Sequence, residues 1–77
     1  MPSILRLGPF RFSYMGDWWE PPHVHVEAGE KLAKFWLEPV RLASSDRFRA
    51  HELARLRATV VEHETTFREA WRVRFGR

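Results

Sequence analysis

Two consecutive prolines followed by a strict alternation of polar and apolar residues constrain the fold of this 77-residue chain more than any other stretch. Pro21 and Pro22 lack the backbone N–H that a helix or a central strand needs, so a loop must lead into the next segment. Residues 23–27 read His-Val-His-Val-Glu. Because neighbouring side chains of a strand point to opposite faces, this pattern predicts a strand with both histidines on one face and both valines on the other. We expect the valines to pack in a core and the histidine face to be open and available for chemistry.

A first hairpin is predicted before this strand, in residues 3–15. Gly8 can adopt the positive φ of a tight turn, and Pro9 the negative φ that follows it. With that turn, Arg6 lies opposite Arg11 on one face. The two like charges are either solvated and splayed apart or bridged by an anion, so both arginines are candidates for binding a phosphate or carboxylate. The predicted apolar face of the hairpin comprises Leu5, Leu7, Phe10, Phe12 and Tyr14, with Leu7 opposite Phe10 and Leu5 opposite Phe12.

The loop at residues 16–22 carries two adjacent tryptophans. Neighbouring side chains of an extended segment point apart, so one of Trp18 and Trp19 enters the core more easily and the other is a candidate contact residue. The alternative is that both fold back over a thin core. Glu20, next in the loop, completes this set of candidate binding residues.

Gly29 and Glu30 form the predicted loop of a second hairpin. The predicted pairs are Val24 with Phe35 and Val26 with Ala33 on the apolar face, and His23 with Trp36, His25 with Lys34 and Glu27 with Leu32 on the other. A shift by one residue would bury Lys34, so the register is strongly determined. A longer loop would move the pairing by an even number of residues.

One apolar stripe at helical spacing runs through the C-terminal half of the chain. It comprises Leu53, Leu56, Val60, Phe67, Trp71 and Phe75, with Glu64 as its one polar member. No Gly or Pro interrupts it before Gly76, so we expect a single helix over residues 49–75, on the order of 40 Å long. The alternative is two shorter helices that break near residues 63–65, where β-branched and polar residues weaken the run.

The segment between the second hairpin and this helix is expected to be short. Residues 40–42 predict a brief strand at the edge of the sheet, next to Pro39. Ser44, Ser45 and Asp46 are the expected capping residues of the helix.

These elements predict an α+β fold in which two antiparallel hairpins, with four to five strands in all, form one sheet against a long C-terminal helix or helix pair. We expect a single domain over residues 1–77, with the sheet in residues 1–43 and the helical part in residues 46–76. So small a core rarely supplies more than roughly 3 to 5 kcal/mol. We therefore expect a small cognate partner protein or a homo-oligomer to add stability.

The composition excludes several classes of protein. The chain has no Cys, which excludes disulfides and thiolate metal sites, and no apolar run is long enough for a signal peptide or a membrane span. We therefore expect a cytoplasmic protein without membrane contact. The net charge is +3 and eleven of the thirteen basic residues are Arg, which favours bidentate contacts with an acidic partner, either a nucleic acid or a protein.

His23 and His25 are the candidate catalytic residues. Side chains two positions apart on a strand lie on the same face within about 7 Å, so both could reach one small ligand. Two imidazoles can share the acid and base roles that metal-independent cleavage of a phosphodiester requires. Lys34 would stabilise charge developing on the phosphate, and Trp36 would stack on a base. The alternatives are contact with a ligand or partner without catalysis, and a polar outer face with no such role.

Metal binding is a third hypothesis, because a His-x-His strand can chelate a divalent ion. Glu27 lies about 13 Å from His23 along the strand and cannot join both histidines at one ion. A third ligand would have to come from Asp17, Glu20, His51 or His63. The chain also lacks the second His of a zinc-protease helix, a Gly-rich phosphate loop and a nucleophile elbow. We therefore predict no cofactor and assign no metal ligand.

Several segments together are characteristic of one group of proteins. They are the opening Met-Pro-Ser-Ile-Leu-Arg, the Phe-Arg-Phe at residues 10–12, the Glu-Pro-Pro-His-Val-His-Val at residues 20–26, the Ala-Lys-Phe-Trp-Leu at residues 33–37 and the Ala-Trp at residues 70–71. In these the chain resembles, from end to end, the bacterial domain of unknown function family DUF4160, of the EPPHVHV type. It departs from the family at Trp18 and Trp19, where relatives have small polar residues, and at Arg49, where relatives often place a capping Ser.

The resemblance implies a two-gene module of the toxin–antitoxin type, because genes of this family often lie beside a second small gene. The chain is more similar to the toxin side, since it has no helix-turn-helix and no basic disordered arm. The resemblance therefore implies a toxin-like protein that acts on RNA through His23, His25 and Lys34, with Arg6 and Arg11 as further contacts. The alternative is a noncatalytic module that binds a protein or a nucleic acid.

Overall fold

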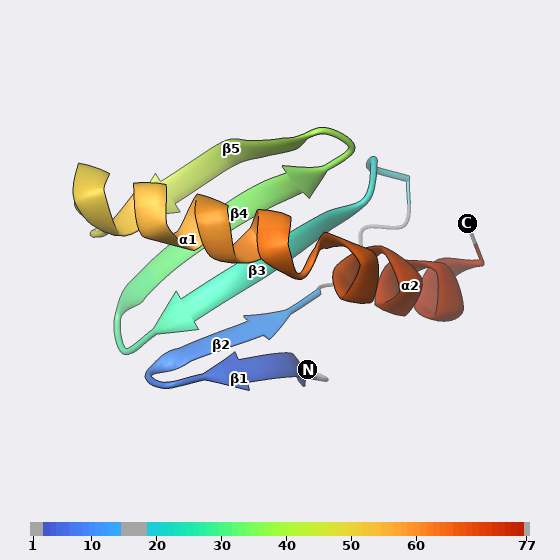
Figure 1. The fold of residues 1–77 in the computed structure, drawn as a ribbon, viewed down its shortest axis with the longest axis horizontal. Helices are drawn as coiled ribbons and strands as arrows, with labels where there is room; N and C mark the ends of the chain where they lie inside the picture. The colour runs from blue at the N-terminus through green and yellow to red at the C-terminus, as the bar shows by residue number, and fades with distance from the viewer. Residues whose placement is uncertain (1–2, 15–18, 77) are drawn as a thin grey trace.

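The structure, a computed structural model, describes residues 3–14 and 19–76. Five strands are followed by two helices: β1 (Ser3–Leu7), β2 (Phe10–Ser13), β3 (His23–Ala28), β4 (Lys31–Leu37), β5 (Val40–Asp46), α1 (Ala50–Glu62) and α2 (Glu64–Phe75). The strands form one antiparallel sheet in chain order, and both helices lie on the same face of it (Figure 1). The predicted α+β fold is confirmed.

Both predicted hairpin registers are confirmed. Leu7 lies opposite Phe10 and Arg6 opposite Arg11 in the first hairpin. In the second, all five predicted pairs are observed, from His23 with Trp36 to Glu27 with Leu32. Gly8 and Gly29 have φ angles of 57° and 62°, which a residue without a Cβ adopts most easily in a tight turn.

The predictions for residues 40–46 are wrong in two respects. Instead of three residues, β5 has seven, and Ser44, Ser45 and Asp46 belong to it rather than capping a helix. These polar residues are exposed, so pairing their backbone with β4 buries no polar side chain. The sheet therefore continues through residue 46, beyond the predicted boundary at residue 43. At the start of α1, the Glu52 carboxylate accepts a hydrogen bond of 2.8 Å from the Arg49 backbone N–H.

The preferred prediction of one long helix is also wrong, and the alternative of two helices is confirmed. The break lies at His63, with φ −107° and ψ 19° between α1 and α2. A straight helix over residues 49–75 would be on the order of 40 Å long, whereas the longest extent of the Cα trace is 33 Å. The break allows Leu56 and Val60 of α1 and Phe67 of α2 to reach the same core.

The core lies between the helices and the valine face of β3. Its strand residues include Phe12, Val24, Val26, Phe35 and Leu37, all fully buried. In Figure 1, α2 lies at the end of the sheet where β3 begins, which places Trp71 near the first residue of that strand. Neither helix of the described chain combines the length and apolar character required to cross a membrane.

Candidate functional site

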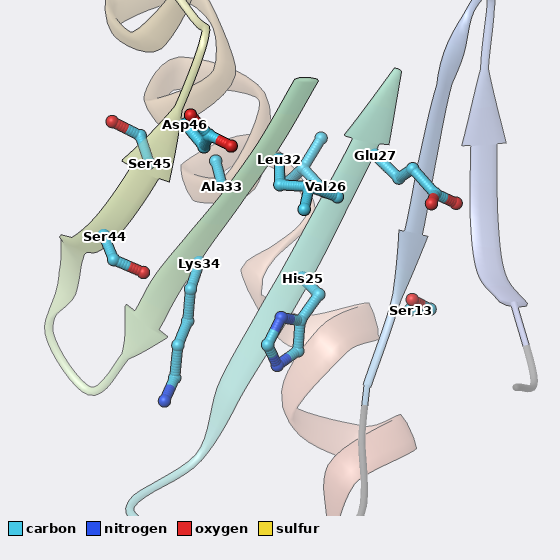
Figure 2. Close-up of a pocket in the computed structure, with 10 residues that line it drawn as sticks. All are labelled: Ser13, His25, Val26, Glu27, Leu32, Ala33, Lys34, Ser44, Ser45 and Asp46. Atoms are coloured by element: carbon cyan, nitrogen blue, oxygen red, sulfur yellow. The ribbon is translucent and has the colours of Figure 1, made fainter. Parts of the chain in front are cut away.

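A hollow of about 490 Å³ lies on the face of the sheet that the helices leave uncovered. Figure 2 views this face, with the helices behind the strands. His25 and Lys34 line the hollow from β3 and β4 and are directly opposite each other in the register. Ser13 of β2 and Ser44 and Asp46 of β5 line it from either side. The hollow therefore brings together a half-buried imidazole, an ammonium group, hydroxyls and the carboxylates of Glu27 and Asp46.

Lys34 is held by two neighbours on this face. Its Nζ donates to both carboxylate oxygens of Glu20, at 3.0 and 2.9 Å. The same Nζ lies 4.6 Å from the centroid of the Trp36 ring, within cation–π range. The side chains of Lys34 and Glu20 are only 17% and 25% exposed. The Glu20 carboxylate thus occupies a position on Lys34 that the oxygens of an anionic ligand would take.

The prediction that His23 lies on an open face is wrong, because Trp71 of α2 packs against its ring. His23 is 1% exposed, and its ring centroid lies 4.7 Å from that of Trp71 and 5.2 Å from that of His25. Its Nδ1 lies 2.9 Å from the backbone oxygen of Pro21. Since a carbonyl oxygen only accepts, Nδ1 carries the proton and donates it. His23 is therefore a buried residue in contact with the half-buried His25.

Arg6 and Arg11 lie opposite each other but line a second hollow, of about 400 Å³, with Pro9, Glu27 and Gly29. Arg11 forms an ion pair with Glu27, which also lines the hollow. The carboxylate of Glu27 therefore supplies a counter-charge to Arg11. Arg6 is exposed.

Only one of the two predicted loop tryptophans is among the residues that the structure describes. Trp18 lies outside the described residues, and Trp19 is 66% exposed. Among residues 3–14 and 19–76, no three His, Asp or Glu side chains form a group that could hold a metal ion. Asp17, one of the ligands considered for such a site, lies outside the described residues.

A comparison with known protein families matches residues 10–72 to a domain of unknown function, DUF4160. The chain belongs to this family. The match covers most of the chain and includes β2 to β5 and Trp71, so it contains the whole hollow and the residues that bury His23. No curated protein and no solved structure gave a significant match.

The site of this DUF4160 domain includes residues that the sequence did not single out. Ser13 reaches the hollow because β2 pairs with β3 and places it opposite His25. Ser44 reaches it because β5 continues past residue 42 and pairs it with Lys34. The pairing between the two hairpins depends on the loop that joins them, which carries no register signal. Chemically, the site sets an imidazole opposite an ammonium group whose anion position is taken by the Glu20 carboxylate.

Proposed function

We propose that this DUF4160 protein is the toxin-like component of a two-gene module and acts on RNA at the hollow beside His25. The observation that carries the proposal is the position of His25 and Lys34, which face each other across β3 and β4 and both line the hollow on the uncovered face. This is the chemistry that a phosphodiester requires: a base near neutral pH beside a fixed positive charge.

In the proposed reaction, the 2′-oxygen of a ribose attacks the neighbouring phosphorus and the bond from phosphorus to the 5′-oxygen breaks. His25 takes the proton of the 2′-hydroxyl, and a proton returns to the leaving 5′-oxygen from the imidazolium or from water. Lys34 stabilises the charge that develops on the phosphate oxygens. Trp36, half-buried on the same face, offers its ring to a base.

His23 is a positioning residue in this proposal rather than a catalytic one. It is buried, its Nδ1 is bonded to the Pro21 backbone, and its ring contacts that of His25 edge to face. The contact between the two rings restricts the orientation of His25, which lines the hollow.

The test is induced expression in a bacterial host, with growth and total RNA integrity followed together. The unaltered chain is expected to arrest growth and degrade RNA, and His25→Ala is expected to abolish both effects. His51→Ala is the matched control, because His51 is exposed on α1 and does not line the hollow. Circular dichroism of both variants checks that the fold is retained. Growth arrest by His25→Ala equal to that by the unaltered chain would contradict the proposal, as would normal growth with the unaltered chain.

A second candidate function is a noncatalytic module that binds RNA or a protein on the same face. The burial of His23 favours it, because a mechanism shared between two imidazoles needs both at the substrate. Purified protein incubated with a labelled RNA oligonucleotide separates the candidates. Binding that Lys34→Met weakens, without any cleavage of the RNA, would favour the binding module over the enzyme.

A further inference from the structure

β5 is an edge strand that pairs with β4 on one side and with no other strand of the described part of the chain on its outer side. The sheet order β1-β2-β3-β4-β5 leaves this side unpaired, and Figure 1 shows β5 at the margin of the sheet. The side chains of β5 from Arg41 to Asp46 are exposed except for the half-buried Ala43. An edge strand presents backbone N–H and C=O groups that can pair with another strand. The unpaired backbone groups of this edge are therefore available to a partner strand.

The two charged residues of β5, Arg41 and Asp46, have no ion-pair partner among residues 3–14 and 19–76. Arg47, which follows β5, is paired with Glu30. In the ladder with β4, Arg41 lies opposite Trp36 and Asp46 opposite Leu32. Trp36 and Leu32 alternate with the core residues of β4, so Arg41 and Asp46 both lie on the uncovered face. One strand thus carries two opposite charges on one face, both available to a partner.

The extra residue Ala43 makes this arrangement possible. In a regular strand, residues five positions apart point to opposite faces. Between Leu42 and Ser44 the ladder with β4 skips Ala43, which shifts the alternation by one and returns Asp46 to the face of Arg41. A second β5, placed antiparallel about a two-fold axis near Ala43 and Ser44, therefore sets each Arg41 opposite the Asp46 of the other copy.

We propose that β5 pairs with β5 of a second copy of this chain, so that the two sheets form one continuous antiparallel sheet. The partner strand is β5 of a second copy, because two antiparallel β5 strands place a positive residue of one opposite a negative residue of the other. Opposite charges directly across two strands stabilise the pair, and like charges destabilise it. Because Asp46 lines the hollow, the Arg41 of the second copy lies at its rim and adds a positive charge to the site.

The test is sedimentation velocity of the purified protein over a concentration series. A single strand pair is a small interface, so the unaltered chain is expected to form a reversible dimer whose population rises with concentration. The proposed dimer contains two pairs of residues 41 and 46, one on each side of the two-fold axis. Arg41→Asp or Asp46→Arg places like charges opposite each other in both pairs. Each is expected to raise the dissociation constant at least about tenfold. The double variant restores opposite charges and is expected to dimerise like the unaltered chain.

Arg57→Asp is the matched control, because it makes the same charge reversal at an exposed position of α1. An unaltered chain that stays monomeric at every concentration would overturn the proposal. So would a dimer that neither single reversal weakens, or one that the double variant fails to restore, which would assign the edge to a different partner. The experiment contains no RNA, so its outcome is independent of the function proposed above.

Discussion

Val60 and Val61 are neighbours in α1 that differ chiefly in burial, so the same substitution at each tests how the helix lies on the sheet. Val60 is 0% exposed and belongs to the core, whereas Val61 is 47% exposed. We expect Val60→Ala to destabilise the protein clearly and Val61→Ala to have a much smaller effect.

The size of the difference follows from the two exposures. Val→Ala removes two carbon groups, each worth about 0.8 kcal/mol when buried, so Val60→Ala loses about 1.6 kcal/mol of transfer free energy and Val61→Ala about half of that. Any space left at Val60 adds about 24 cal/mol per Å³ that does not close. Ala has a higher helix propensity than Val, but this gain is the same in both variants and cancels between them. The free energy of unfolding should therefore differ by about 1 to 2 kcal/mol between them.

The assay is urea unfolding followed by circular dichroism and tryptophan fluorescence, with the two variants beside the unaltered chain. The urea dependence of the unfolding free energy should be the same for all three proteins, so that a change in midpoint reports stability alone. Equal midpoints for the two variants, or a lower midpoint for Val61→Ala, would refute this orientation of α1.

Three further substitutions test contacts described above. A hydrogen bond from Lys31 lowers the pKa of the Glu52 carboxyl, and a backbone N–H lowers it further. This contribution to stability is present above the unfolded-state pKa and is lost as pH falls through the lower folded-state pKa, so Glu52→Gln should flatten the acid side of a pH series of urea unfolding. Trp71→Phe, which keeps an aromatic ring in the core but covers less of the imidazole, should lower the free energy of unfolding and should speed chemical modification of His23 by diethyl pyrocarbonate in the folded protein. Glu20→Gln should strengthen binding of an RNA oligonucleotide in fluorescence anisotropy, because a phosphate no longer has to displace a carboxylate.

Each of these predictions has a contrary result. If Glu52→Gln leaves the pH dependence of the unfolding free energy unchanged at acid pH, the hydrogen bonds of Glu52 do not contribute to stability as predicted. Modification of His23 at the same rate with and without Trp71 would mean that another group protects the imidazole. Weaker RNA binding by Glu20→Gln would mean that Glu20 positions Lys34 for the ligand rather than competing with it.

The strand registers could be predicted from the sequence because each depends on local alternation and a short turn. A one-residue shift of the pairing between β3 and β4 would bury Lys34, and the positions of Gly8 and Gly29 indicate the two turns. The length of β5 could not be predicted in the same way, since Ser44 to Asp46 have side chains typical of a helix cap, and only the neighbouring β4 makes them a strand. The break at His63 was predicted only as the alternative to one long helix, because the apolar stripe keeps its helical spacing on both sides of residues 63–65.

Part of the candidate site could be predicted from the sequence in the same way, and part could not. The facing positions of His25 and Lys34 follow from the hairpin register. The burial of His23 does not, because it depends on where α2 places Trp71, and helix placement on a sheet leaves no local pattern in the strand. The pairing of Glu20 with Lys34 was missed for a similar reason: it depends on the path of a loop, which side-chain alternation does not describe.

The order of the strands has a consequence for how the protein is made. Neighbours in the sheet are neighbours in the chain, so the sheet can grow one hairpin at a time as the polypeptide leaves the ribosome. The two helices that cover its apolar face follow all five strands in the chain, so the strands leave the ribosome before their cover is made. A ribosome that stalls just after Asp46 would release a sheet whose core residues, Val24 and Phe35 among them, face water. Such a fragment would be a substrate for chaperones and proteases, whereas the finished protein hides these residues completely.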